Sequence, residues 1–141
     1  MSAPKALPKI TLTNTLGGKK EVFVPKKEGK VSIYSCGPTV YGKIHVGNAM
    51  AALTSDLVQR VFRLAGYEVE WATNITDVDD KIIKAANEEG IAALEIAKRY
   101  EAIYLNEMKA LGVSEPAHRP HATESIPEMI TMISSLIEQG Y

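Results

Sequence analysis

Residues 31–48 read VSIYSCGPTVYGKIHVGN and join a strand-like run to the start of a helical one. Residues 31–36 are short, apolar and bounded by Gly37-Pro38, which is typical of a mostly buried parallel strand. From about Val46, apolar residues recur at every third or fourth position, which predicts a helix that Gly66 ends. Its apolar stripe consists of Met50, Leu53, Leu57, Val61 and Leu64. A strand therefore passes directly into a helix.

The following segments repeat this order. Residues 69–75 alternate in part and contain Trp71, which predicts a second strand, and Thr76-Asp77 offers an N-cap for a helix running toward Asn87. The order strand–helix–strand–helix favours a parallel sheet with right-handed crossovers, and such sheets bind ligands outside the carboxyl ends of their strands. We therefore expect an α/β fold with its site at that edge.

Two flanking parts complete the prediction. Residues 10–15 and 21–24 predict a hairpin that turns at Gly17-Gly18. A further helix is predicted to end at Gly112, with an apolar stripe of Leu94, Ala97, Tyr100, Tyr104, Met108 and Leu111. Residues 125–128 read SIPE, a capping box for a last helix, whose apolar face we expect to be uncovered. That face consists of Ile126, Met129, Ile130, Ile133, Leu136 and Ile137.

The composition of the 141 residues, 45% hydrophobic and 23% charged, is that of an ordinary soluble globular protein. The net charge is −1, from 16 basic and 17 acidic residues, so any nucleic-acid role must rest on a local patch or on parts outside this chain. The single cysteine, Cys36, excludes an internal disulfide framework and a zinc site built only from cysteines of one chain. Without a signal peptide or a membrane-spanning run, we expect a cytoplasmic protein.

Residues 36–48 carry the chemistry of the sequence. Gly37 and Gly47 permit close backbone approach, and a helix that starts near His45 presents unpaired amide donors. The side chains of His45 and Asn48 add further donors, so the segment suits a phosphate and would stabilise charge on a phosphate under attack. A loop stiffened by Pro38 with a surface histidine explains the same spacing equally well.

Other polar residues also allow two interpretations. Cys36 is either a small buried side chain or a thiolate metal ligand at the sheet edge, and burial is favoured for a lone cysteine. Three acidic residues, Asp77, Asp79 and Asp80, could bind a cation, but favourable interaction with a helix N-terminus is the preferred explanation. We expect solvent-exposed side chains at His118 and His121, at the pair Arg60 and Arg63, and at the pair Lys81 and Lys84.

Three segments resemble the N-terminal part of the cysteinyl-tRNA synthetase family, which are class I aminoacyl-tRNA synthetases. They are 14–16 (NTL) with 21–25 (EVFVP), 36–48, and 74–83 (NITDVDDKII), and the match runs from about residue 10 to residue 141. The resemblance implies a Rossmann-like catalytic domain of the α/β class. It divides the chain into an N-terminal extension with hairpin (1–25), the first half of the domain (26–112) and a helical segment leading to the remainder (113–141). We therefore expect an N-terminal fragment that is inactive alone.

The resemblance also assigns site residues. His45-Val-Gly-Asn48 lies at the class I His-Ile-Gly-His signature, which implies that His45, Gly47 and Asn48 bind ATP and that His45 and Asn48 are catalytic. Cys36 aligns with the first ligand of an active-site zinc that binds the thiolate of the substrate cysteine. The amino acid itself would be contacted by Gly37, Thr39 and Thr76. Met50 stands where an arginine is expected, which weakens or relocates one nucleotide contact.

The implied reaction uses ATP with Mg²⁺ and L-cysteine to form cysteinyl-adenylate, and then transfers cysteine to tRNA(Cys). The family implies a monomeric enzyme without a membrane partner. The other zinc ligands and a Lys-Met-Ser-Lys-Ser loop are not present in the sequence. Two alternatives stay open: the related cysteine ligase of mycothiol biosynthesis, which uses an amino sugar in place of tRNA, and a non-catalytic nucleotide-binding paralogue.

Overall fold

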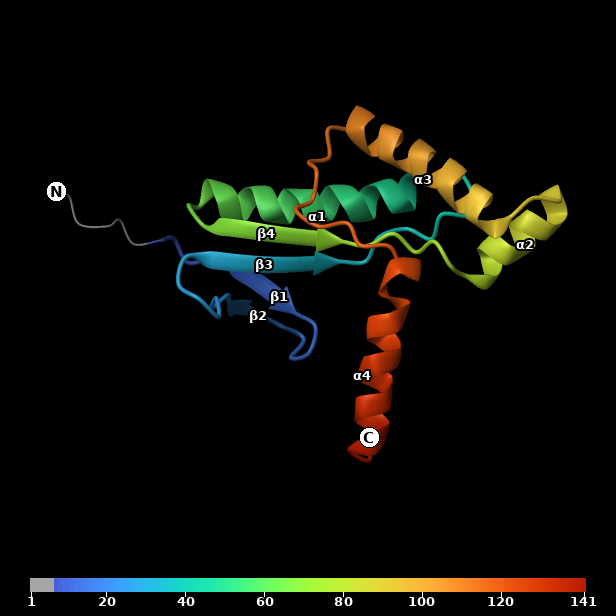
Figure 1. The fold of residues 1–141 in the computed structure, drawn as a ribbon. Coiled ribbons are helices and arrows are strands. Elements are labelled where there is room, and N and C mark those ends of the chain that lie inside the picture. Colours follow the sequence, from blue (N-terminus) through green and yellow to red (C-terminus); the bar gives the residue numbers. More distant parts are fainter. Residues whose placement is uncertain (1–6) are drawn as a thin grey trace.

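The computed structural model describes residues 7–141, so residues 1–6 of the predicted N-terminal extension lie outside it. Its elements appear in Figure 1. In chain order they are β1 (Thr11–Asn14), β2 (Lys19–Val22), β3 (Lys30–Ser35), α1 (Val46–Leu64), β4 (Glu68–Thr73), α2 (Asp80–Glu89), α3 (Ala93–Ala110), the short 3₁₀ helix η1 (Thr123–Ser125) and α4 (Ile126–Glu138). None of the helices in residues 7–141 is long and apolar enough to cross a membrane.

β3 and β4 form a two-stranded parallel sheet, with Val31 opposite Val69 and Ser35 opposite Thr73. The chain between them forms α1, which runs alongside the strands (Figure 1). The predicted parallel pairing is confirmed. The prediction that β3 is mostly buried is wrong, because Val31 is its only buried residue. Successive side chains of a strand point to opposite faces, and only one face of β3 is covered within the described residues.

The second edge of β4 is occupied by the segment that precedes η1. The backbone N–H of Ala117 donates to the carbonyl of Trp71 (2.8 Å), and that of Thr73 donates to the carbonyl of His118 (3.0 Å). Farther along, the N–H of Ile75 donates to the carbonyl of Pro120 (2.9 Å). A loop therefore continues the parallel arrangement beyond β4, which the sequence did not indicate.

α1 spans the predicted residues but presents another face to the protein. Leu57 is 62% exposed and Leu64 is 90% exposed, whereas Asp56, Gln59 and Phe62 are buried. The whole apolar stripe, with Met50, Leu53 and Val61, lies among the exposed residues, although the apolar stripe of a helix usually faces the core. The reason is that the inward side of α1 meets a loop whose polar groups need hydrogen-bond partners, as described below.

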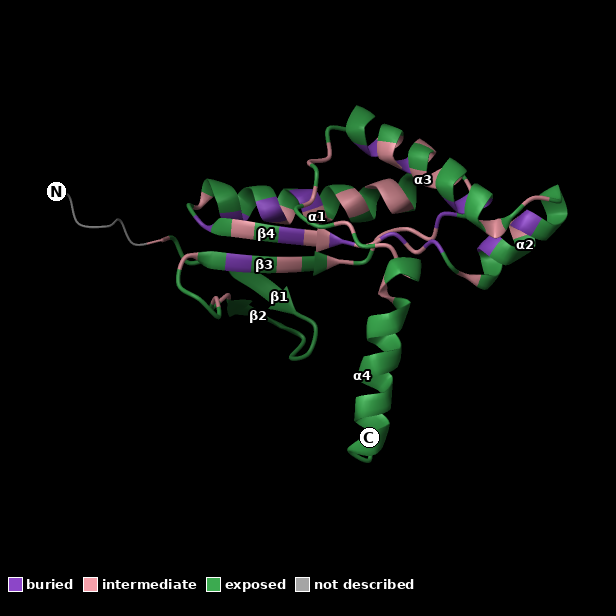
Figure 2. Ribbon diagram, viewed as in Figure 1, coloured by how far each residue is buried: buried purple, intermediate pink, exposed green. Residues whose placement is uncertain are grey.

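Two clusters of buried side chains make the core, and Figure 2 marks the buried positions along the ribbon. The larger cluster joins α2 and α3 to the loops beyond the sheet and comprises Val40, Ile75, Ile82, Ala86, Ile96, Ala97, Tyr104 and Met108. In the smaller cluster, the ring of Phe62 packs edge-on against Phe23 and Tyr67, at centroid distances of 5.0 and 5.5 Å. The contact between Phe23 and Phe62 fastens the segment that follows the hairpin to α1.

The helix boundaries differ from the predictions in two places. α2 starts at Asp80 with Asp79 as its N-cap, so the predicted cap at Thr76-Asp77 is wrong. α3 ends before Gly112, as predicted, and buries Ala97, Tyr104 and Met108 of its predicted stripe. The two ends of that stripe, Leu94 and Leu111, are exposed, while Ile96 is buried in their place.

The terminal elements are the least buried. β1 and β2 pair in an antiparallel hairpin with Thr11 opposite Val22, and Gly18 in its turn has φ +63°, which confirms the predicted hairpin. Its second strand lies at Lys19–Val22 instead of 21–24. α4 projects from the body with every residue exposed (Figure 2). The predicted capping box is wrong, because the Ser125 hydroxyl donates to the carbonyl of His121 instead of capping α4.

Candidate active site

The carboxyl ends of β3 and β4 are joined by two loops that run side by side. The N–H of Val40 donates to the carbonyl of Thr76 (3.2 Å), and the N–H of Thr76 donates to the carbonyl of Pro38 (3.0 Å). Thr39 and Thr76 are paired as parallel bridge partners. The structure therefore brings together two of the predicted amino-acid contacts, Thr39 and Thr76, at the sheet edge where ligands of parallel sheets bind.

Asn74 holds Gly37 against the end of β4. Its Oδ1 accepts from the Gly37 N–H (2.9 Å) and the Tyr34 hydroxyl (3.1 Å), and its Nδ2 donates to the Thr76 hydroxyl (3.1 Å). A Cβ at Gly37 would lie 1.6 Å from the carbonyl oxygen of Asn74, so this approach requires glycine. Asn74 was not among the predicted site residues, although it opens the 74–83 segment.

Cys36 follows β3 directly and is exposed, so the prediction of a buried cysteine is wrong. Cys36, Gly37 and Asn48 are among the residues that line a cavity of about 70 Å³. Tyr104 and Arg119 also line the cavity, and neither was predicted as a site residue. They join the site only through the packing of α3 and the following loop, which no local motif signals.

Tyr104 lines this cavity with only 7% of its surface exposed. Burial raises the pKa of its hydroxyl, and the nearby Arg119 opposes that shift. The hydroxyl therefore stays protonated at neutral pH and keeps its hydrogen-bond donor.

The start of α1 is organised by a reciprocal cap. His45 is the N-cap, and its Nδ1 accepts from the N–H of Gly47 (3.0 Å). In return, the Oδ1 of Asn48 accepts from the N–H of His45 (3.1 Å). A Cβ at Gly47 would lie 2.8 Å from Cε1 of His45, so the close ring requires glycine there. The predicted position of the helix start is confirmed.

This cap changes which donors are available to a ligand. The N–H groups of His45 and Gly47 are already used, and that of Asn48 donates to the His45 carbonyl (3.0 Å), so the expectation of open amides is wrong for these residues. Because Nδ1 accepts a hydrogen bond, the neutral ring carries its proton on Nε2. The side-chain donors that remain are therefore Nε2 of His45 and Nδ2 of Asn48. The first turn of α1 contains no acidic residue to oppose an anion.

The acidic residues have structural roles, but the predicted position at a helix N-terminus holds only for Asp79 and Asp80. Asp77 is buried and accepts hydrogen bonds from the backbone N–H and the hydroxyl of Thr123. Burial opposes ionisation of Asp77, but these bonds and nearby His121 outweigh it and lower the pKa of the carboxyl. Asp79 caps α2 by accepting from the N–H of Lys81 (2.8 Å). The two carboxylates therefore have different roles: Asp77 binds Thr123, and Asp79 caps α2.

The two later histidines differ in exposure. His118 is exposed and lies 2.8 Å from Glu70, which confirms the predicted surface position. His121 is half-buried, with Nε2 at 2.9 Å from Glu101 and Nδ1 at 3.6 Å from Glu124, so the prediction of a solvated residue is wrong there. Burial lowers the pKa of His121, but Glu101 and the other carboxylates outweigh it and raise the pKa.

The basic pairs on α1 and α2 are exposed, as predicted. Lys81 lies over the ring of Tyr41 at 5.3 Å, which brings the start of α2 to the 36–45 loop. Lys84 lies 3.9 Å from Glu88, and Arg63 donates weakly to the carbonyl of Val69 (3.4 Å). None of these contacts places the four side chains in the cavity.

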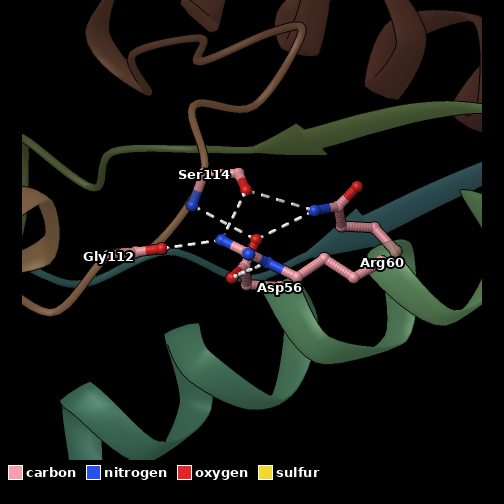
Figure 3. Close-up of polar contacts among 5 residues, drawn as sticks. Asp56, Arg60, Gly112 and Ser114 are labelled. Atoms are coloured by element: carbon pink, nitrogen blue, oxygen red, sulfur yellow. Dashed lines mark hydrogen bonds and ion pairs between the residues drawn. The ribbon is translucent and has the colours of Figure 1, made fainter.

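Asp56 organises the inward face of α1, as Figure 3 shows. It accepts from the Arg60 guanidinium (2.7 Å), the Gln59 amide (2.9 Å) and the N–H of Ser114 (3.2 Å). Arg60 also donates to the carbonyl of Gly112 (2.7 Å). Burial opposes ionisation of Asp56, but these hydrogen bonds lower its pKa. The network fastens the loop after α3 to α1, and this loop contributes Ser114 and Arg119 to the lining of the cavity.

Residues 22–141 match the family described as the catalytic domain of class I (C) tRNA synthetases. Several curated relatives named cysteine–tRNA ligase match 132 residues, which are 94% of this chain. The relative from Lachnoclostridium phytofermentans is 54% identical, that from Geobacter metallireducens 50% and that from Brevibacillus brevis 47%. This chain spans only 27–28% of the length of these relatives.

Among solved structures, the chain resembles Mycobacterium tuberculosis methionyl-tRNA synthetase in complex with methionyl-adenylate. The TM-score is 0.58 and the sequence identity 24%, over 60% of this chain and 17% of the other. At this identity the likeness concerns the fold, which agrees with the predicted Rossmann-like α/β class.

Proposed function

The chain belongs to the class I (C) tRNA synthetase catalytic-domain family, and on that basis we propose that it forms the nucleotide-holding part of a cysteine–tRNA ligase. One observation carries the proposal: His45 and Asn48 cap α1 reciprocally at the carboxyl end of β3, and Asn48 shares a cavity with Cys36. The names of the relatives support cysteine as the amino acid.

The proposed reaction has two steps. A carboxylate oxygen of cysteine attacks the α-phosphate of ATP, the bond to the β-phosphate oxygen breaks, and cysteinyl-adenylate and pyrophosphate result. The terminal ribose of tRNA(Cys) then takes the cysteinyl group and AMP leaves. Both steps place negative charge on phosphate oxygens, so the contribution expected from the protein is a set of fixed donors.

His45 is suited to this task by its cap. The bond from the Gly47 N–H to Nδ1 fixes the ring and leaves the proton on Nε2, which can donate to a phosphate oxygen. Asn48 is fixed in the same way through Oδ1, which leaves Nδ2 as the donor. We propose that these two donors bind ATP, together with the close backbone approach that Gly47 allows.

The amino acid would lie at the paired loops. Thr39 and Thr76 are half-buried neighbours there, and the Asn74 side chain holds both Gly37 and the Thr76 hydroxyl. We propose that Gly37, Thr39 and Thr76 contact the substrate cysteine. The Asn74 contacts give this subsite a fixed shape before any ligand binds.

The zinc implied by the resemblance is not accommodated by the described residues alone. Residues 7–141 contain no group of three His, Cys, Asp or Glu side chains that could hold a metal ion. Cys36 offers one exposed thiol, whereas a structural or catalytic zinc needs three or four protein ligands. We propose Cys36 as one ligand of a zinc site that residues 7–141 do not complete by themselves.

A chimera tests the proposed function. The matching 132 residues of the Lachnoclostridium phytofermentans relative would be replaced by those of this chain, and cysteine-dependent exchange of pyrophosphate into ATP measured. We expect exchange from the chimera. His45→Asn keeps an N-cap acceptor but removes the Nε2 donor, and should lower the exchange rate by about 100-fold.

The matched control is His118→Asn, which makes the same chemical change at an exposed residue outside the site. It should leave the exchange rate unchanged. A folded chimera without exchange, or one in which both histidine variants behave alike, would contradict the assignment. Acceptance of an amino sugar in place of tRNA would favour the mycothiol-type ligase instead.

A further inference from the structure

Charge is unevenly distributed along this chain. Residues 7–30 contain six lysines and two glutamates, a net charge of +4. Residues 31–141 contain nine basic and fifteen acidic residues, a net charge of −6. All six lysines of the first segment are exposed. The overall charge of −1 therefore conceals a basic region made by the hairpin and the turn that follows it.

Part of this region forms a groove beside the amino-terminal ends of β3 and β4. The groove has a volume of about 510 Å³ and is lined by Val24, Lys26, Lys27 and Lys30 together with Glu68 and Glu70. In Figure 1 this segment lies at the end of the sheet opposite the 36–45 loop. The groove is thus separate from the candidate active site.

A tight turn pairs the backbones of Lys27 and Lys30. The N–H of Lys30 donates to the carbonyl of Lys27 (3.1 Å), and the two residues are antiparallel bridge partners. Gly29 has φ +73°, which the turn requires. The turn therefore brings Lys27 and Lys30 next to each other among the residues that line the groove.

The carboxylates at the groove already have partners. Glu68 lies 2.8 Å from Nζ of Lys30, and Glu70 lies 2.8 Å from Nε2 of His118. Among the described residues, no carboxylate forms an ion pair with Lys26 or Lys27. These two ammonium groups are the ones available to an external anion.

We propose that this groove binds the phosphodiester backbone of RNA through Lys26 and Lys27. This proposal rests on the proposed function, in which tRNA is the substrate. It assigns part of the protein surface that contacts the tRNA. A membrane surface is the less suitable partner. The exposed apolar helix, α4, carries Glu128 and Glu138 and no basic residue, so it has nothing to attract anionic lipid.

The test measures the salt dependence of RNA binding. The 141-residue chain would be titrated with unfractionated tRNA by fluorescence anisotropy between 50 and 200 mM salt. Each lost phosphate contact reduces the slope of log K against log salt by about 0.9. Lys26→Gln/Lys27→Gln should therefore reduce the slope by about 1.8 and weaken binding on the order of tenfold. The control, Lys98→Gln/Lys109→Gln, removes two exposed lysines of α3 and should match the unmodified chain.

A second readout separates this effect from misfolding. The Lys27 side chain forms no ion pair among the described residues, so Lys27→Gln should leave Tm unchanged while weakening tRNA binding. Any one of three results would overturn the proposal. They are equal slopes for the two double variants, binding to phosphatidylserine vesicles but not to tRNA, and no tRNA binding at 50 mM salt. Pyrophosphate exchange by the chimera needs no tRNA, so Lys26→Gln/Lys27→Gln should retain it there. If only the proposed function is wrong, the chimera would show no pyrophosphate exchange while the 141-residue chain still bound tRNA through Lys26 and Lys27.

Discussion

At Gly37, the lack of a Cβ lets two loops meet at the sheet edge. Gly37→Ala would place a methyl carbon 1.6 Å from the Asn74 carbonyl oxygen, so the loops must separate. We expect a loss of about 3 kcal/mol in the free energy of unfolding, measured by urea denaturation. Gly42→Ala is the control in the same loop, because its Cβ would meet nothing within 4 Å. Similar losses for both variants would contradict the packing described for Gly37.

His121 makes the stability of the protein depend on pH. Its carboxylate neighbours are Glu101 of α3, Glu124 of η1 and Asp77 before α2. They raise the folded-state pKa of His121 above the ordinary 6.5, so the added stability is present below pH 6.5. It is lost as the pH rises through the folded-state pKa. His121→Gln should therefore lower Tm more at pH 5.5 than at pH 9.

The control for this prediction is His118→Gln, at a histidine whose side chain is 60% exposed. Its effect on Tm should be small at both pH values, since exposed ion pairs contribute little. If the effect of His121→Gln grew with pH, the sign of the pKa shift would be wrong.

At the scale of elements, α1 and the loop after α3 are joined through Asp56. Asp56→Ala leaves the part-buried N–H of Ser114 without this acceptor and leaves the Gln59 amide with only its 3.3 Å bond to the Ser114 hydroxyl. We expect a cost of about 3 kcal/mol in the free energy of unfolding. Arg60→Ala is the matched comparison, because the Arg60 side chain is 54% exposed and its loss should cost about 1 kcal/mol or less. Guanidinium denaturation of both variants measures the difference. Equal losses would mean that the Arg60–Asp56 pair, and not the buried acceptor, carries the contact.

The same helix shows the limit of sequence patterns for elements. Periodicity predicts where α1 begins and ends, but it cannot tell which face packs inward when both faces contain suitable residues. Asp56 and Gln59 read as surface residues until the Ser114 loop is placed beside them. The start of α2 was missed for a related reason, since Thr76 and Asp77 resemble a cap in sequence but take part in loop pairing and in the contact with Thr123.

At the scale of the whole molecule, α4 is independent of the two core clusters. All of its residues are exposed, and a 13-residue helix is marginal in water without packing. Removal of residues 126–141 should therefore leave the Tm of the remaining body unchanged to within about 2 °C. Near-ultraviolet circular dichroism of buried Trp71 would follow the unfolding of the body. A large fall in Tm would show that α4 supports the core.

The sequence by itself determined the class of fold, the order of the elements and the position at which α1 starts, because these depend on local periodicity and on the residues next to each element. Only the tertiary structure decided which face of α1 is buried, that Cys36 is exposed, and that Tyr104 and Arg119 line the cavity beside Asn48. It also decided that Lys27 and Lys30 face one groove with Glu68. These features depend on contacts between residues distant in the chain, whose burial and charge are set by packing and not by the neighbouring sequence.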